Sequence, residues 1–294
     1  MTEAYALVRE LPPMREPLLV VAMDGWIDAS SAAQHAMELL VKEVGATALV
    51  TFEPDLFVDF RARRPTMELR EGVNTRLVWS AAVLHHGRDI NDKDVLVLNG
   101  PEPDMAWNRF AGLVGDLAKK FGVRRMIGLG AYPYATPHTR AVYVSCTSPS
   151  AELVASLPYL KSSVDVPAGM EAMLEHAMHA RKIPAVGLWA RVPHYVSAMA
   201  YPAATAALLG GVCDVGGISI DVSEVRTQAT VQRERLDQLV AGNPEHARML
   251  TQLEATFDQE LASGTTEVHF GGPIPSGDEL AAEFERYLRE QRSE

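Results

Sequence analysis

The stretch DVLVLNGPEPDMAWNRFAGLVGDLAKKFGVRRMIGLGA, residues 94–131, determines the fold class. It begins and ends with continuous apolar runs, which are typical of strands in a sheet that is covered on both faces. Between these runs, apolar residues recur at the spacing of one helix face. A strand, a helix and a second strand in this order predict two parallel strands joined by a crossover helix. The residues of the helix face are Phe110, Leu113, Val114, Leu117 and Phe121.

The same alternation continues on both sides of this stretch. Residues 18–23 predict a strand, and a helix follows in which Ala33 and Met37 share one face. Asp28 or Ser30 can cap the start of that helix. Further strands are predicted at residues 46–52, 76–83, 141–147 and 184–192.

A methionine-rich stripe marks another helix. Its apolar residues fall on one helix face, and methionine at this spacing usually fills a core. We therefore expect this face to pack against the sheet and not to form a soft-metal site or a peptide groove. The residues of the stripe are Met170, Met173, Leu174, Ala177 and Met178.

These elements predict an α/β protein with two parts. Residues 1–220 form a three-layer α/β/α core domain whose sheet is mainly parallel and partly mixed. Residues 221–294 are richer in charge and form a helical hairpin that turns at Gly242, followed by a capping helix that starts at Ser276.

Composition excludes several classes of function. The net charge of −11 opposes binding to nucleic acid, and no apolar run is long enough to span a bilayer. Two cysteines without metal-like spacing indicate reduced thiols, so we expect a soluble cytoplasmic protein. The GLG at residues 128–130 lacks the rest of the dinucleotide fingerprint, and no phosphate-binding loop or nucleophile elbow occurs. We expect no cofactor, no metal and no assignable catalytic residue.

Polar and aromatic residues follow the predicted strands, where parallel sheets bind ligands. If the strands are parallel, these residues share one rim and form a candidate pocket. His138 and His194 could act there as general acid and base, or the Pro-His turns could simply end the strands. The candidate pocket residues are Asp24, Trp26, Glu102, Asp104, Trp107, His138, Arg140, His194 and Tyr195.

The motifs along the chain resemble the proteasome assembly chaperone (subunit two) family in its bacterial full-length branch. The resemblance implies a core similar to the nucleoside phosphorylase and hydrolase architecture, C-terminal helices and self-association. Eukaryotic relatives guide assembly of the proteasome α-ring. The motifs are DGWIDASSAA, FVDFRARRP, DVLVLNGPEPDMAWNRF, PHTR, GLWARVPHYV and SGDELAAEFERYLR, in that order.

This sequence departs from the family pattern at two places. It ends in Arg-Glu-Gln-Arg-Ser-Glu, whereas the eukaryotic chaperones dock through a C-terminal hydrophobic-Tyr-any motif. The turn VPAGM, residues 166–170, replaces a Gly-Pro-Thr-Gly-Ile-like turn and retains Gly169, so a pocket at this turn is expected to differ.

Two functions follow from the sequence. The first is a non-catalytic assembly or binding protein that forms a homo-oligomer, with a trimer as one candidate, and that contacts proteasome subunits. The alternative is a small-molecule enzyme of the phosphorylase or hydrolase type with a nucleoside-like or anionic substrate. In the second case Arg140 would hold the anion, His138 or His194 would move a proton, and Trp107 or Tyr195 would stack on the substrate.

Overall fold

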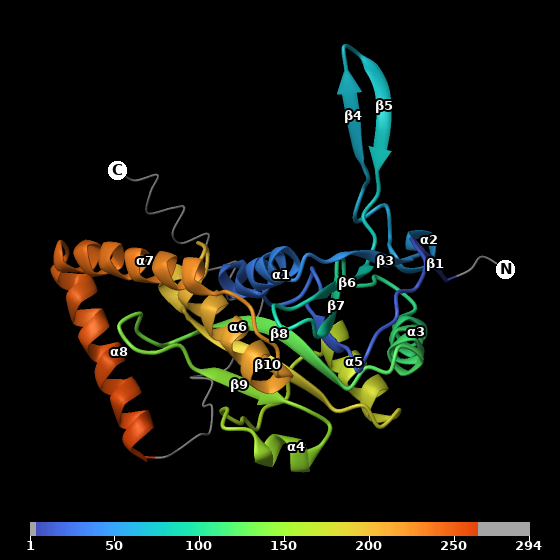
Figure 1. Cartoon of the computed structure of the whole chain (residues 1–294). Coiled ribbons are helices and arrows are strands. Elements are labelled where there is room, and N and C mark those ends of the chain that lie inside the picture. The colour runs from blue at the N-terminus through green and yellow to red at the C-terminus, as the bar shows by residue number, and fades with distance from the viewer. Residues whose placement is uncertain (1–3, 264–294) are drawn as a thin grey trace.

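The computed structural model describes residues 4–263 and shows an α/β protein built on one eight-stranded mixed sheet (Figure 1). Its strands are β1 (Tyr5–Leu7), β2 (Leu18–Val21), β3 (Thr47–Phe52), β6 (Val83–Arg88), β7 (Asp94–Asn99), β8 (Arg125–Tyr134), β9 (Val144–Thr147) and β10 (Ala185–Pro193). Their order across the sheet is β1-β3-β6-β7-β2-β8-β10-β9.

The four central strands, β7, β2, β8 and β10, pair in parallel. The flanking pairs are antiparallel: β6 on β7, β3 on β6, β1 on β3 and β9 on β10. The connection between β6 and β7, residues 89–93, is too short for a parallel crossover, so these strands must run in opposite directions. The prediction of a mixed sheet is confirmed, but parallel pairing is restricted to the centre and is less extensive than predicted.

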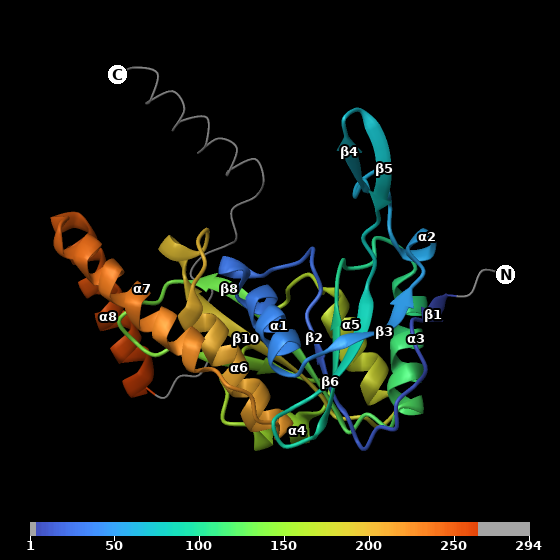
Figure 2. The ribbon, with the colours of Figure 1, turned by 45° about the horizontal axis from the view of Figure 1, so that its top comes forward.

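The single strand predicted at residues 76–83 is wrong. Val73–Val78 forms β5, which pairs with β4 (Thr66–Arg70) in a separate two-stranded hairpin, and β6 begins at Val83. Between them, the Trp79 ring packs edge-to-face on Phe60, with centroids 4.6 Å apart. The β4–β5 hairpin projects away from the body of the molecule in both views (Figures 1 and 2).

Helices cover both faces of the sheet. Helices α1 (Ala32–Glu43) and α6 (Pro202–Gly216) lie on one face, and α3 (Trp107–Lys120) and α5 (Met170–His179) lie on the other. No helix in the described part of the chain is long and apolar enough to cross a membrane. The short helices are α2 (Pro54–Phe57) and α4 (Ala151–Ser156), and the 3₁₀ turns are η1 (Ala29–Ser31) and η2 (His194–Val196).

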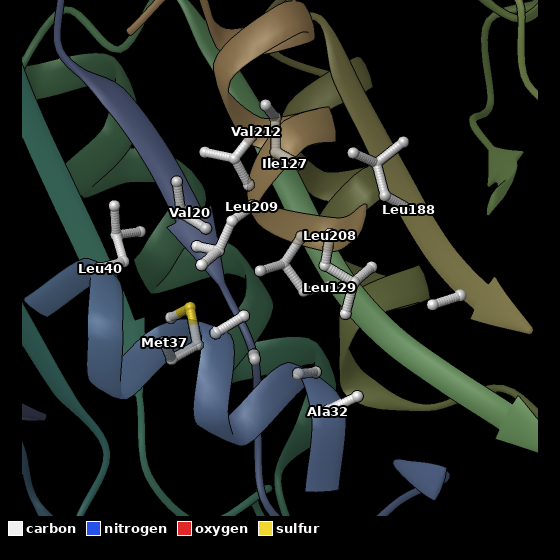
Figure 3. Packing of buried hydrophobic residues seen from close by; sticks show 14 of the residues in the cluster. Val20, Ala32, Met37, Leu40, Ile127, Leu129, Leu188, Leu208, Leu209 and Val212 are labelled. Atoms are coloured by element: carbon white, nitrogen blue, oxygen red, sulfur yellow. The ribbon is translucent and has the colours of Figure 1, made fainter. Parts of the chain in front are cut away.

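The two faces carry separate apolar clusters. On the α1–α6 face, Val20, Ile127 and Leu188 of the strands meet Met37 of α1 and Leu208 of α6 (Figure 3). On the other face, the methionine stripe of α5 packs with α3 and the sheet, as predicted. Burial of this apolar surface on both faces is the main favourable term in folding.

The predicted helical hairpin consists of α7 (Ser223–Ala241) and α8 (Pro244–Ser263). Val225 and Leu236 of α7 belong to the α1–α6 cluster, so α7 packs directly on the core. Phe257 of α8 is 5% exposed and stacks on Tyr143, with centroids 4.9 Å apart. The capping helix predicted from Ser276 lies outside the described residues.

Candidate functional site

A cavity of about 840 Å³ opens at the carboxyl ends of the parallel strands. Its floor is formed by residues at or just beyond the ends of β2 and β7 and by inner residues of β8 and β10. The first two turns of α1 and of α5 and the segment 162–169 form its walls. Ligands usually bind at this edge of a parallel sheet, because connections and helix N-termini converge there. The volume is that of a small-molecule site.

Two tryptophans line the cavity, and each depends on a neighbouring glycine. The Trp189 ring covers Gly130 of the adjacent strand so closely that a Cβ there would lie 2.3 Å from the ring. Trp26 is 40% exposed and lies over Gly169, where a Cβ would be 2.8 Å from Cδ1 of Trp26. The indole N–H of Trp189 donates to Thr147 Oγ1 at 3.3 Å. Both rings are therefore presented to the cavity at defined positions.

Two buried glutamates of α5 also line the cavity. Glu171 and Glu175 are 8% and 5% exposed and are four residues apart, which places them on one helix face. Glu175 Oε1 accepts a hydrogen bond from Thr147 Oγ1 at 2.8 Å, and burial raises the pKa of Glu175 to about 7. Glu171 accepts from the Met23 backbone N–H, whereas its Oε2 has no hydrogen-bond partner in the described part of the chain.

Burial raises the pKa of Glu171 well above its ordinary value. The negative charges of Glu175, Asp28 and Glu102, which line the same cavity, raise this pKa further. An unpaired buried carboxylate is costly, so Glu171 in this arrangement favours its neutral form.

Two of these carboxylates also cap helices. Asp28 accepts hydrogen bonds from the backbone N–H groups of Ala33 and Gln34, each at 2.9 Å, so the predicted capping of this helix by Asp28 is confirmed. Glu102 Oε1 accepts from the Met170 N–H at the start of α5. Burial is the main cause that raises the pKa of both carboxyl groups, and these backbone hydrogen bonds oppose it.

Among residues 4–263, those that line the cavity include no Lys, Arg or His. The nearby Arg63 is held outside by Asp104, with Nε 3.1 Å from Oδ1, and its Nη1 donates to the Asp24 carbonyl oxygen at 3.4 Å. The lining therefore has a strongly acidic character and three aromatic rings, those of Trp26, Tyr132 and Trp189. The acidic lining residues are Asp24, Asp28, Glu38, Glu102, Glu171 and Glu175.

The Pro-His turns lie elsewhere, against the C-terminal hairpin. His138 is 3% exposed; its Nδ1 lies 2.7 Å from the Tyr195 hydroxyl and its Nε2 lies 3.2 Å from Asp237 of α7. Arg140 forms a bidentate pair with Asp258 of α8, at 2.9 and 2.7 Å. These turns attach α7 and α8 to the core.

Comparison with known proteins identifies the family. The sequence profile described as the PAC2 family matches residues 22–240, more than half of the chain. The chain belongs to the PAC2 family. No curated protein matches the chain.

Solved structures agree with membership of the PAC2 family. A Corynebacterium glutamicum protein of unknown function is 31% identical, with a TM-score of 0.81 over 88% of this chain and 98% of that one. A Mycobacterium tuberculosis proteasome-assembly chaperone homologue is 32% identical, with a TM-score of 0.73 over 79% of this chain and 99% of that one. A Pyrococcus furiosus archaeal proteasome activator, at 16% identity and a TM-score of 0.60, covers 80% of this chain and 97% of its own, and shares the fold.

This PAC2 fold divides the predicted rim into two regions. Asp24, Trp26 and Glu102 line the cavity. Asp104 pairs with Arg63 beside it, and the Trp107 indole N–H donates to the Pro103 carbonyl oxygen at 2.6 Å. In the second region, His138, Arg140 and Tyr195 face the C-terminal helices, and His194 is exposed with its ring against Tyr195 at 5.3 Å.

Two of the buried acids of the PAC2 cavity were not predicted from the sequence. Glu171 and Glu175 sit within the methionine stripe of α5, and both are buried together with Met170, Leu174 and Met178. Their i, i+4 spacing places both acids on one helix face, and this is the sequence feature that could have drawn attention to them. The expected difference at the VPAGM turn concerns this same cavity, because Pro167, Ala168 and Gly169 line it.

Proposed function

We propose that this PAC2 protein is a non-catalytic assembly or binding protein that self-associates through its β4–β5 hairpin. The hairpin projects from the body of the molecule (Figure 2). The observation that carries the proposal is that the rest of the described chain leaves apolar side chains of this hairpin exposed.

The register of the hairpin defines that face. Met67 pairs with Leu77 across the two strands, and Leu69 lies two residues beyond Met67 on the same side. These three side chains are 50%, 42% and 50% exposed, respectively. The opposite face carries Glu68 and Arg76, which form an ion pair at 3.3 Å, together with Val73 and Val78, which are 62% and 38% exposed. Both faces of the arm therefore expose apolar side chains, and on strand β4 these lie on the face of Met67 and Leu69.

An isolated two-stranded hairpin is marginally stable in water, and exposed apolar clusters on an arm usually mark an interface. A second copy of the chain supplies a matching apolar face, because the same arm projects from every copy. Closed symmetric homo-oligomers are the commonest assemblies of this kind. Self-association would therefore cover Met67, Leu69 and Leu77.

Relatives support a ring-shaped partner for the oligomer. One solved relative is described as a proteasome-assembly chaperone homologue, and a protein with the same fold is described as an archaeal proteasome activator. Within this proposal, the oligomer binds proteasome subunits as an assembly factor.

The test is the oligomeric mass of the full chain, measured by light scattering after size-exclusion chromatography. The double variant Met67→Ser, Leu69→Ser is expected to run as a monomer at concentrations where the wild type is an oligomer. Arg70→Ser, on the polar side of the same strand, is the matched control and should retain the oligomer. A monomeric wild type would contradict self-association. Native mass spectrometry with purified proteasome α-subunits then tests the ring partner.

A small-molecule enzyme is the second candidate, because the strand-end cavity contains buried carboxyl groups. Glu175, with its pKa raised to about 7, is suited to proton transfer near neutral pH. The lining has no cation for phosphate, and Arg140 is paired with Asp258 and Glu254, so the cavity favours hydrolysis over phosphorolysis. The test is chromatographic detection of free base from a panel of nucleosides, with and without phosphate. Turnover that Glu175→Gln abolishes would favour this candidate.

A further inference from the structure

We infer that the strand-end cavity binds a small organic cation, an amine whose ammonium group lies beside Glu171 and Glu175 and whose apolar part lies against Trp26 and Trp189. This inference is independent of self-association, because the β4–β5 hairpin contributes no residue to the cavity.

The acidic charge of the lining is not balanced there by a basic residue of the described chain. Among residues 4–263, six acidic residues and no basic residue line the cavity. Buried carboxylates are normally paired or hydrogen-bonded to several donors. Glu171 is 8% exposed and lines the cavity, yet its Oε2 has no hydrogen-bond donor in the described part of the chain. This oxygen is itself buried, so a ligand reaches it only when the Glu171 carboxyl group turns toward the cavity. An ammonium group has three N–H donors and a positive charge, and so supplies what this oxygen lacks once that turn is made.

The positions of the two tryptophan rings in the cavity also favour a cation. Trp26 lies at the exposed side of the cavity and Trp189 lies deeper, beside Thr147 and Glu175. Tryptophan is the side chain whose face attracts cations most strongly. Met37, Leu129 and Met170 complete an apolar lining for the carbon chain of the ligand. Carboxylates, indole faces and thioethers together fit an alkylammonium ion.

Other ligand classes fit less well. An anion would face carboxylates with no cation in the lining, since Arg63 is held outside by Asp104. In the part of the chain that the structure describes, no group of three or more His, Cys, Asp or Glu is placed to hold a metal ion. A neutral ligand carries no charge to stabilise the ionised carboxylates. It would supply the hydrogen-bond donor that Glu171 lacks only if the ligand carried an N–H or O–H group. An organic cation is the class of ligand that accounts for both the acidic lining and the missing hydrogen-bond donor at Glu171.

Binding of a cation should release protons. Glu171 faces Glu175 on its own helix, Asp28 before α1, Glu102 after β7 and the Met23 N–H after β2. Glu175 faces Thr147 of β9, and its charge also acts on the thiol of Cys146. Glu102 lies near both Arg63 and Asp104, and Asp28 lies near His35. Burial holds Glu171 and Glu175 toward their neutral forms, and a bound ammonium group favours their ionised forms.

The experiment is isothermal titration calorimetry of the full chain with hexylamine and 1,6-diaminohexane. Hexan-1-ol and hexanoate are the neutral and anionic controls of the same length. We expect both amines to bind, about tenfold more tightly at pH 8 than at pH 6, because Glu175 ionises across this interval. We expect binding at pH 7 to release protons. The number of protons released is measured from the binding enthalpies in buffers of different ionisation enthalpy. Hexanol and hexanoate should bind at least tenfold more weakly than hexylamine.

The variants are Glu171→Gln and Glu175→Gln, which keep the side-chain volume and remove the charge. Each is expected to weaken hexylamine binding at least tenfold at pH 8. Glu152→Gln is the matched control, because Glu152 is exposed on α4 outside the cavity, and should bind as the wild type does. If a Gln variant does not fold, the proton release and pH dependence of the wild type decide the matter. Absence of amine binding, proton uptake, or equal binding of hexanol would overturn the inference.

Discussion

The Nδ1 atom of His138 lies 2.7 Å from the hydroxyl oxygen of Tyr195, and this contact joins the two Pro-His turns of the chain. The same hydroxyl accepts from the His138 backbone N–H at 2.8 Å, and Asp237 of α7 faces the other ring nitrogen. A ring with its proton on Nε2 satisfies all three contacts, because the Tyr195 O–H can then donate to Nδ1. The turns that end β8 and β10 thus form one hydrogen-bonded unit beneath α7.

Tyr195→Phe should destabilise the folded protein by about 1–3 kcal/mol, because it leaves the buried N–H and Nδ1 of His138 without their partner. The measurement is the free energy of unfolding from urea denaturation. His194→Ala is the control: this histidine is exposed, so its loss should change stability by less than about 0.5 kcal/mol. Equal losses of stability in both variants would mean that the hydrogen bonds between His138 and Tyr195 make no specific contribution to the free energy of unfolding.

Arg140→Ala should loosen α8 without unfolding the core. Arg140 contacts Glu254 and Asp258 of α8, and Phe257 is the principal apolar contact nearby. We expect faster backbone amide exchange across residues 244–263 and unchanged exchange in β8 and β10. Arg248→Ala, which changes an exposed α8 residue without an ion pair among the described residues, should leave the exchange of α8 as in the wild type. Unchanged exchange in Arg140→Ala would show that apolar packing alone holds α8.

Sequence reasoning recovers the parts of this fold that local pattern controls. The strand–helix–strand unit at residues 94–131 appears as β7, α3 and β8, because continuous apolar runs and a 3.6-residue period are local signals. The prediction of one strand at residues 76–83 was wrong because its apolar residues belong to two elements. Leu77 and Val78 lie in the exposed β4–β5 hairpin, and Val83 begins β6. Composition alone does not distinguish an apolar face that a partner covers from one that the chain's own core covers.

The sequence could not predict that the strand-end residues divide into two regions, because the partners of some of them are distant in the chain. His138 and Arg140 follow a parallel strand, as Glu102 does, but their partners Asp237 and Asp258 lie about a hundred residues further along the chain. Only the packing of α7 and α8 brings these groups together. The resemblance to the family gave the correct membership, because its motifs extend over the whole chain. It also pointed to a pocket at the VPAGM turn, which lines the cavity, but it assigned no catalytic residue.

Glu175→Gln should stabilise the protein increasingly as the pH rises from 5 to 7. The pKa of Glu175 is raised from its ordinary 4.5 to about 7 in the folded state, so folding takes up a proton within this interval. The stabilising contribution of the protonated group is complete below pH 4.5 and is lost as the pH rises through 7. The stability difference between variant and wild type should therefore grow by about 2 kcal/mol between pH 5 and 7 and then level off. Glu152→Gln, measured in the same series, corrects for general charge effects. A difference that does not vary with pH would contradict the buried, protonated state of Glu175.

Gly169→Ala should displace Trp26 and alter the mouth of the cavity. A Cβ at residue 169 would lie 2.8 Å from Cδ1 of Trp26 and 3.3 Å from Oε1 of Glu102. The backbone of Gly169, with φ of −89°, accepts alanine without strain, and Trp26 is exposed enough to move, so we expect a loss of stability below about 1 kcal/mol. The substitution should shift the tryptophan emission spectrum, because the indole of Trp26 moves to a different environment. The chain has other tryptophans, so the same substitution in a Trp26→Phe background is the control and should leave the spectrum unchanged. A shift that persists in that background would place the effect at another tryptophan and contradict the contact between Trp26 and Gly169.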